Sequence, residues 1–143
     1  MNKENDMGAE RLTFESLDSN DIFKLINTTR EGVDIKTFDE FSVVYPLNSM
    51  DWSRILNVSE RTIQRYRREK RRFDPIHTEK LLLIMLLFKK GTEVFESTSD
   101  FLIWINSRNI ALGGIKPVEL LDNSFGINMV NDELLRIEHG VLA

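Results

Sequence analysis

The sequence has no cysteine among its 143 residues, which excludes disulfide bonds and thiolate-bound zinc. Long apolar stretches are missing too: the longest, residues 81–88, has eight residues, against the roughly 20 that span a bilayer. The N-terminal residues lack the apolar core of a signal peptide, so we expect no export. Together these absences are typical of a cytoplasmic protein, because disulfides are rare in that compartment.

Groups that carry catalysis are equally scarce. The two histidines, His77 and His139, lie far apart in the chain. Gly113 and Gly114, followed by Lys116, lack the Gly-Lys-Ser/Thr end of a phosphate-binding loop. The acidic residues and histidines show no metal-ligand spacing. We therefore expect no enzymatic activity, no metal and no other cofactor.

Charge is distributed unevenly along the chain. Residues 60–72 hold seven basic and two acidic residues, a net charge of +5, whereas the rest of the chain carries a net charge of −9. Such asymmetry indicates a local site for a polyanion. The alternative is a solvated helix face, which we disfavour because seven cations so close together repel one another.

Apolar residues recur at helical spacing, and no alternating run is long enough to indicate a strand. The predicted fold class is therefore all-α. Residues 1–19 are polar, and residues 1–36 form an expected N-terminal arm, partly disordered or with one short helix that ends near Gly32. We expect the arm to be frayed through residue 19.

Capping residues and prolines indicate where the further helices begin and end. One helix is expected to stop before Pro46, because the residue before a proline avoids the α region. A short helix should start at Pro117, and a break at Phe125 and Gly126 should precede a last helix over 127–139. The expected N-caps are Thr37, Ser49 or Asp51, Ser59, Asp74, and Ser97 or Ser99.

Two short helices around a tight turn are predicted for residues 51–72. Asn57 tolerates the left-handed conformation that such a turn needs, and Ser59 is a strong N-cap for the second helix. Ile63 and Tyr66 lie one turn apart and can pack inward, which leaves the other face open. This layout is that of a helix-turn-helix, whose exposed second helix contacts DNA.

Ten side chains on the second helix and the basic stretch behind it are the expected DNA contacts. Arg61, Gln64 and Arg65 can read base edges, because arginine pairs with guanine and glutamine with adenine. The basic residues from Arg67 onward suit phosphates, as does the N-terminus of the helix. The sequence leaves open which of them touches a base, and Thr62 can instead be half-buried. The ten are Ser59, Arg61, Thr62, Gln64, Arg65, Arg67, Arg68, Lys70, Arg71 and Arg72.

The next predicted helix opens with Asp74 and Pro75, is apolar on all sides over 81–88, and is expected to end at Gly91. All of its faces must be buried, either in the core of one chain or in a dimer interface. The sequence leaves both possibilities open. The residues assigned to this core or dimer contact are Leu82, Ile84, Met85 and Phe88.

The stretch VSERTI, with Leu56 before it, resembles the L-A-x-x-L-G-V-S-x-x-T-I pattern of Xre/Cro-type helix-turn-helix proteins. Ser53 stands where the pattern has a small alanine at the crossing of the two helices. Asn57 replaces the glycine of the turn, which its conformational tolerance allows. The aligned positions are Trp52, Ser53, Leu56, Asn57, Val58, Ser59, Thr62 and Ile63.

The C-terminal third resembles the C-terminal region of the MbcA/ParS/Xre antitoxin family. Members show a Trp, then Asn and Leu-Gly-Gly, Pro-x-x-Leu-Leu, Gly-x-x-x-Val, and Leu-x-x-Ile-x-x-Gly-Val. The two resemblances together cover roughly residues 40–143. The matching residues are Trp104, Asn109, Leu112, Gly113, Gly114, Pro117, Leu120, Leu121, Gly126, Val130, Leu134, Ile137, Gly140 and Val141.

This resemblance implies the antitoxin of a RES–Xre type II toxin–antitoxin system. Its helix-turn-helix would bind operator DNA and repress its own operon, as a homodimer on two half-sites. Its C-terminal domain would bind and block a RES-domain toxin that consumes NAD⁺. The implied organisation is an N-terminal arm at 1–36, a DNA-binding region at 37–73, a central core or dimerisation helix at 74–96, and a toxin-binding domain at 97–143.

The resemblance also implies a role for the end of the chain. We expect it to lie at the toxin's active-site cleft, where its carboxylates can mimic the pyrophosphate charge of NAD⁺. The alternative is that Ile137 and Val141 complete the core and Gly140 stops the helix, and for Ile137 this alternative is favoured. The residues assigned to toxin binding are Arg136, Glu138, His139, Gly140, Val141, Leu142 and Ala143.

Two other functions fit part of the sequence. A stand-alone dimeric helix-turn-helix regulator would share the DNA contacts but have no toxin, and a toxin gene next to this one would argue against it. A protein-interaction module that has lost DNA binding is the other alternative. The basic cluster at 60–72 argues against that module.

Overall fold

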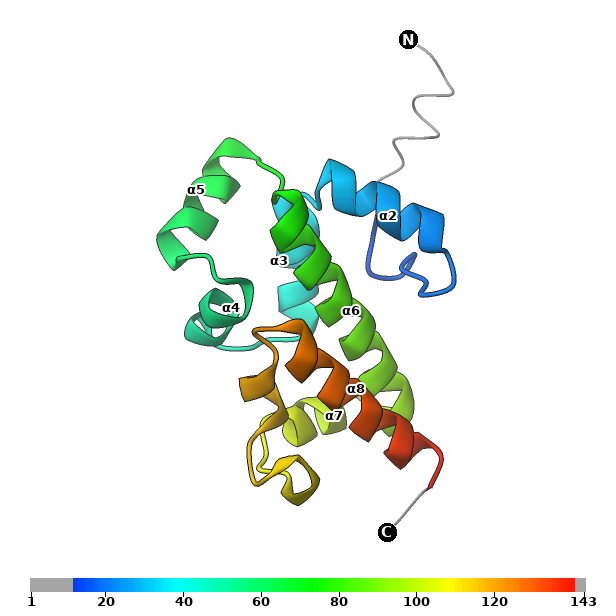
Figure 1. Cartoon of the computed structure of the whole chain (residues 1–143). Coiled ribbons are helices and arrows are strands. Elements are labelled where there is room, and N and C mark those ends of the chain that lie inside the picture. Colours follow the sequence, from blue (N-terminus) through cyan, green and yellow to red (C-terminus); the bar gives the residue numbers. More distant parts are fainter. Residues whose placement is uncertain (1–11, 141–143) are drawn as a thin grey trace.

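The computed structural model describes residues 12–140, whose regular structure is helical apart from two isolated bridges, Asp34 with Arg72 and Asn109 with Ile115. The all-α prediction is confirmed for these residues. In chain order the elements are α2 (Ile22–Glu31), α3 (Ile35–Val44), α4 (Ser49–Leu56), α5 (Glu60–Glu69), α6 (Pro75–Phe95), α7 (Thr98–Ile105), the 3₁₀ turns η1 (Ile110–Leu112) and η2 (Pro117–Leu120), and α8 (Ser124–Glu138) (Figure 1).

Helix α6 is the axis around which the others pack. Helices α2, α4, α7 and α8 all contact it, and Figure 1 shows α2, α3 and α5 near its first half and α7 and α8 beside its second half. Within the described part of the chain, neither α6 nor any other helix is long and apolar enough to cross a membrane. The residues assigned to a core or dimer contact, each at most 3% exposed, are buried inside the single chain: Leu82, Ile84, Met85 and Phe88.

Aromatic rings connect the two halves of the molecule. Phe88 of α6 lies 5.5 Å from Phe41 of α3 and 5.1 Å from Phe101 of α7, measured between ring centroids. Tyr45 lies 5.2 Å from Phe88, and its hydroxyl is 2.6 Å from Oγ1 of Thr92. Burial raises the pKa of Tyr45, so the hydroxyl stays neutral at physiological pH. The helix-turn-helix and the C-terminal helices therefore share one core.

Helix α6 continues through Gly91 to Phe95, so the predicted end at Gly91 is wrong. Gly91 is buried, and a Cβ atom there would clash with the ring of Phe101. The glycine allows α7 to approach α6 closely and does not end the helix. The helix ends instead at Glu96, which adopts the left-handed conformation with φ 54°.

We expect Gly91→Ala to lower the free energy of unfolding by about 1–3 kcal/mol. The ring of Phe101 is fully buried and cannot move aside, and the better helix propensity of alanine offsets only part of the overpacking. Urea denaturation followed by circular dichroism would measure the change. Glu93→Ala, on the exposed side of the same helix, is the control and should leave the midpoint nearly unchanged. An unchanged midpoint in Gly91→Ala would contradict the packing role.

Two predicted caps are wrong because an earlier residue fills each role. Asp34 caps α3, and its Oδ1 accepts from the N–H of Thr37 at 2.8 Å. Asn48 caps α4 in place of Ser49 or Asp51, and its side-chain oxygen accepts from the N–H of Asp51 at 2.7 Å. The cap of α3 thus lies three residues before the predicted Thr37, and the cap of α4 lies one residue before Ser49 and three before Asp51.

Helix α8 begins at Ser124, so the predicted break at Phe125 and Gly126 is wrong. Asn123 caps the helix, with its side-chain oxygen accepting from the N–H of Gly126 at 2.9 Å. A Cβ atom at Gly126 would clash with the carbonyl oxygen of Leu120. The glycine thus lets the first turn of α8 pack directly on η2.

Residues 12–19 are packed into the fold and are not frayed as expected. Leu12 and Leu17 are buried in the hydrophobic core. Lys89 of α6 donates to the carbonyl oxygens of Glu15 at 3.3 Å and Leu17 at 2.5 Å. This segment therefore contributes to the packing around α6.

Asp74 caps α6 as predicted, with its Oδ1 accepting from the N–H of His77 at 2.9 Å. That hydrogen bond is the main cause of a lowered pKa of Asp74. We expect Asp74→Ala to cost about 1 kcal/mol of stability at neutral pH. Because the pKa is lower in the folded state, this contribution is present above the unfolded pKa, near 4, and lost as pH falls through the folded pKa.

Denaturation of the wild type and of Asp74→Ala at a series of pH values would check this prediction. The difference between the two proteins should shrink on acidification below about pH 4. A difference that stays constant across that range would show that the carboxylate charge is not what stabilises the helix start.

Candidate functional site

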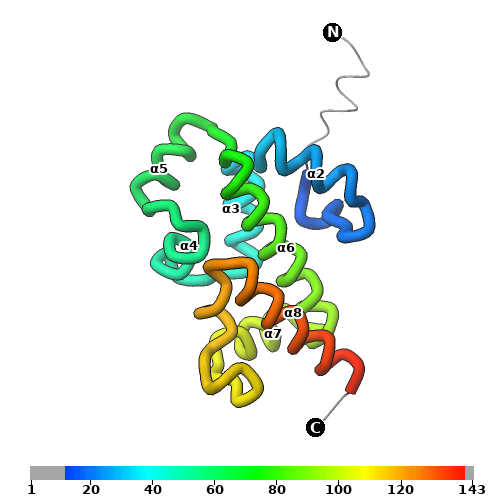
Figure 2. Tube along the Cα trace, in the orientation of Figure 1, coloured from blue at the N-terminus to red at the C-terminus, as the bar shows by residue number. Residues whose placement is uncertain are grey.

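The turn between α4 and α5 is held by local hydrogen bonds, and the tube in Figure 2 follows the chain through it. Asn57 adopts the left-handed conformation as predicted, with φ 56° and ψ 43°. The hydroxyl of Ser53 donates to the carbonyl oxygen of Val58 at 2.8 Å, and the N–H of Val58 donates to that of Ser53 at 3.2 Å. Ser53 thus stabilises the turn from the position where the helix-turn-helix pattern has a small alanine. The predicted N-cap at Ser59 is confirmed, because its hydroxyl oxygen accepts from the N–H of Thr62 at 3.1 Å.

The inward face of α5 packs as the sequence predicted. Val58 and Ile63 are buried. Tyr66 is partly buried, and its ring meets the buried ring of Phe73 edge to face at a centroid distance of 5.5 Å. These contacts fix the rotation of α5 about its own axis, so its polar face has one orientation.

The outward face of α5 is a stripe of four exposed side chains: Arg61, Gln64, Arg65 and Arg68. Their spacing of three, four and seven residues from the first member puts them on one side of the helix. Thr62 is only partly exposed, and its hydroxyl lies 2.9 Å from that of Ser59, so it takes part in the helix cap. The stripe offers guanidinium and amide groups suited to base edges and phosphates.

Arg67 differs from the four side chains of the stripe because its charge forms an ion pair within the fold. Its Nε donates to Oδ1 of Asp39 on α3 at 2.9 Å, and its Nη2 lies 2.8 Å from the same oxygen. The hydrogen bond to Asp39 raises the pKa of Arg67, so the guanidinium is always charged. This bidentate pair braces α5 against α3.

The basic residues at the end of α5 and directly after it, Lys70, Arg71 and Arg72, are exposed. Lys70 ends the helix in the left-handed conformation, with φ 53°. The guanidinium of Arg71 lies 5.1 Å from the ring centroid of Tyr66, and Arg72 donates to the carbonyl oxygen of Gly32 at 3.0 Å. Both guanidinium groups thus contact the fold, which limits the directions in which their charges point.

The second predicted site lies at the C-terminal end of α8. Glu138 pairs with Lys90 of α6 at 2.7 Å, and this lysine holds the pKa of the carboxyl below its usual value. Arg136 pairs with Glu133 on its own helix. His139 and Gly140 are exposed and end the helix. The remaining predicted toxin-binding residues, Val141, Leu142 and Ala143, lie outside the described residues.

A contact without any signal in the sequence joins the helix-turn-helix to the C-terminal part of the fold. Arg54 of α4 donates to the carbonyl oxygens of Val118 at 2.9 Å and Glu119 at 3.3 Å, on η2. No sequence signal pairs residues so far apart, because the acceptors are backbone atoms. The arginine links the helix-turn-helix to the turn on which α8 begins.

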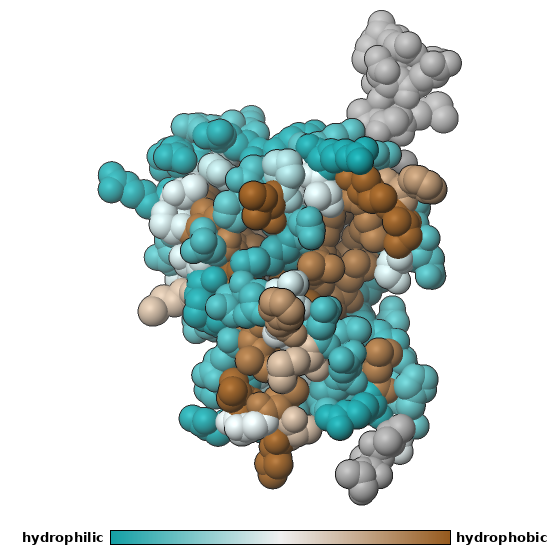
Figure 3. Space-filling model, viewed as in Figure 1, coloured by the Kyte–Doolittle hydropathy of each residue, from teal (hydrophilic) through white to brown (hydrophobic). Residues whose placement is uncertain are grey.

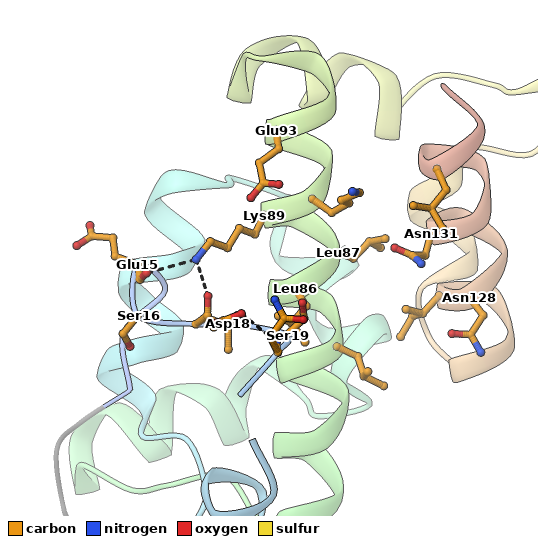
Figure 4. Close-up of a pocket in the computed structure, with 16 residues that line it drawn as sticks. Glu15, Ser16, Asp18, Ser19, Leu86, Leu87, Lys89, Glu93, Asn128 and Asn131 are labelled. Atoms are coloured by element: carbon orange, nitrogen blue, oxygen red, sulfur yellow. Dashed lines mark hydrogen bonds between the residues drawn. The ribbon is translucent and has the colours of Figure 1, made fainter. Parts of the chain in front are cut away.

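A hollow of about 830 Å³ lies between residues 15–20, α6 and α8 (Figure 4). Lys89 is tied to backbone carbonyls on one side, and Asn128 and Asn131 project from α8 on the other. Among the described residues, no group of three or more acidic side chains or histidines could hold a metal ion. The hollow therefore offers hydrogen-bonding groups without a metal-ligand cluster.

Two protein-family models match the chain. Residues 24–85 match the antitoxin Xre-like helix-turn-helix domain, and residues 90–140 match the antitoxin Xre/MbcA/ParS C-terminal toxin-binding domain. The first match begins within α2, which the resemblance read from the sequence did not include. The second takes in the end of α6, α7 and α8. A comparison with curated proteins finds no match.

Proposed function

The chain belongs to the Xre/MbcA/ParS antitoxin family, and on this premise we propose that it represses its own operon and blocks an NAD⁺-consuming RES-domain toxin. In this proposal α5 binds the operator and the C-terminal end of α8 binds the toxin. The protein works by binding and not by catalysis, and both roles are carried out in the cytoplasm. The match to a toxin-binding domain favours this function over a stand-alone regulator.

The exposed stripe on α5 is the observation that carries the DNA-binding proposal. Arg61, Gln64 and Arg65 combine base-reading chemistry with a helix whose rotation is fixed from beneath by Ile63 and Tyr66. The N-terminus of the helix adds backbone N–H groups that suit a phosphate. Arg68, together with the three basic residues after the helix, supplies further phosphate contacts.

Arg67 has a different part in this proposal from the one expected from the sequence. Its guanidinium already forms a bidentate pair with Asp39, so a phosphate would have to compete with a carboxylate for it. We therefore assign Arg67 to holding α5 on α3. The same ion pair cancels one of the positive charges of the cluster.

The proposed toxin contact is made by the residues that follow the last ion pair of α8. Glu138 is bound to Lys90, which neutralises its charge and makes it a weaker mimic of a pyrophosphate than the sequence suggested. We assign Glu138 to orienting the end of the helix. His139, Gly140 and the three residues after them would then enter the toxin's cleft.

In this proposal the protein binds its operator as a homodimer. A single recognition helix covers one half-site, and proteins of this architecture bind two half-sites related by a two-fold axis. The four residues first assigned to a core or dimer contact are buried inside one chain, so they support the core and leave the dimer contact to another surface.

Two measurements test the proposed function. Mobility shifts on the DNA upstream of the gene, repeated at rising salt, should show specific binding whose affinity falls steeply with salt concentration. Expression of the neighbouring open reading frame should stop growth and deplete NAD⁺, and co-expression with this chain should restore both. A neighbour that is harmless, or whose toxicity persists on co-expression, would refute the RES-toxin assignment.

A further inference from the structure

Helix α2 exposes an apolar face that the proposed DNA and toxin contacts do not use. Phe23 is 81% exposed, Ile22 is 55% exposed and Ile26 is 38% exposed, whereas Leu25 packs against the core. Figure 3 shows hydrophobic side chains gathered over α2 and the adjoining stretch of α6. Three neighbouring large apolar side chains on one short helix are unusual for a surface that stays in water.

An apolar groove of about 340 Å³ lies between α2 and α6 beside this face. Two exposed residues of opposite charge, Arg30 of α2 and Glu79 of α6, also line it. The apolar lining residues are Ile22, Leu25, Ile26, Leu82, Leu83 and Leu86. The groove thus combines an apolar floor with one positive and one negative group.

We propose that a second copy of this chain covers the α2 face, which we define as Ile22, Phe23, Ile26 and the groove beside them. In a two-fold contact the same surface meets itself, so it must complement itself in charge as well as in shape. The groove does so, because Arg30 of one copy can meet Glu79 of the partner subunit and the reverse pair forms at the same time. This inference rests on the proposed function, which requires two recognition helices on two half-sites.

Other occupants fit the α2 face less well. Residues 1–11, MNKENDMGAER, are mostly polar or charged and do not suit an apolar groove. The toxin is disfavoured because α2 lies outside residues 90–140, the part of the chain that matches a toxin-binding domain. A second copy satisfies both the apolar floor and the paired charges.

Sedimentation equilibrium of the full chain and of Phe23→Glu tests the proposal. The wild type is expected to be a dimer, and the variant should fall to the 16.7 kDa of one chain. Because Phe23 is 81% exposed, the substitution should leave the fold intact, as thermal unfolding would verify. The matched control is Val43→Glu on α3, where the valine is 79% exposed, and it should remain a dimer.

A charge exchange tests the orientation of the two copies. Arg30→Glu leaves a negative charge at both positions 30 and 79, and Glu79→Arg leaves a positive charge at both. Each variant alone is expected to dimerise roughly tenfold more weakly, because like charges then face each other. Mixing the two variants in equal amounts should restore dimerisation, since both contacts across the axis join opposite charges. An ion pair within one chain would not be restored by mixing.

The outcomes separate this inference from the proposed function. Three results would overturn the α2 face as the dimer contact. These are a monomeric wild type, a Phe23→Glu variant that remains a dimer, and a dimer that is broken by Val43→Glu but not by Phe23→Glu. The proposal would also be overturned if the equal mixture of Arg30→Glu and Glu79→Arg dimerised as weakly as each variant alone. Failure of the mobility shift with an intact dimer would instead count against operator binding and leave the dimer contact standing.

Discussion

Replacing Arg61 and Arg65 together with alanine is expected to abolish specific operator binding. Each bidentate contact from arginine to a guanine is worth about 1–3 kcal/mol of discrimination, so the double variant should lose affinity by a factor of roughly 30 to 10⁴. Both side chains are exposed and lie on the outward face of α5. Their removal should therefore leave the buried contacts of the helix-turn-helix, and the melting temperature, nearly unchanged.

Arg67→Ala is the matched control for that experiment. It removes one positive charge from the same helix, but a charge already paired with Asp39. We expect its effect on operator affinity to stay below about tenfold and its cost in stability to be at most about 1 kcal/mol. Comparable losses in Arg67→Ala, Arg61→Ala and Arg65→Ala would mean that total charge, and not the outward stripe, governs binding. That result would support the alternative in which the basic face of α5 is only solvated or attracts DNA without sequence specificity.

The salt dependence of the shift distinguishes base contacts from phosphate contacts. Each lost phosphate contact should reduce the slope of log affinity against log salt concentration by about 0.9. Alanine at Lys70, Arg71 or Arg72 should change this slope. Alanine at Gln64 should leave it unchanged while relaxing the preference for the operator sequence.

Deleting residues 139–143 is expected to abolish toxin neutralisation while leaving operator binding intact. The truncation removes the residues assigned to the toxin's cleft but keeps α8 to its last helical residue, including the ion pair between Glu138 and Lys90. The core residues of α8, such as Val130 and Leu134, are untouched. Growth rescue on co-expression with the toxin and a mobility shift with the same preparation would measure the two activities.

Glu138→Gln gives a control within the same region. It removes the charge that binds Lys90 but retains the tail, so neutralisation should weaken and not vanish. A truncated protein that still rescues growth would show that the tail is dispensable and that the toxin binds elsewhere on the C-terminal helices. Loss of both activities would point instead to unfolding, which circular dichroism would reveal.

Some structural features follow directly from neighbouring residues in the chain. The left-handed Asn57, the N-cap at Ser59 and the start of α6 at Asp74 and Pro75 were all predicted, because each depends on atoms within about one helical turn. The inward packing of Ile63 was also predicted, since helical periodicity alone assigns it to the buried face.

Other features escaped prediction because their partners are distant in the sequence. Gly91 has the usual signature of a helix end, yet α6 passes through it because Phe101 occupies the space beside it. The cap at Asp34 was missed although its signal is local, since Thr37 was an equally good candidate. The bond from Arg54 to η2 had no signal at all, because its acceptors are backbone carbonyls.

The sequence by itself determined the all-α class, the helix-turn-helix and the two segments that carry the family patterns. Periodicity, capping and turn preferences act over a few residues and are therefore readable without a structure. Only the tertiary structure decided which charges and apolar side chains remain available to partners. Arg67 is paired and Arg61 is exposed, and the apolar helix at 81–88 is core whereas the apolar face of α2 is open. These differences depend on side chains and helices that meet only when the chain has folded.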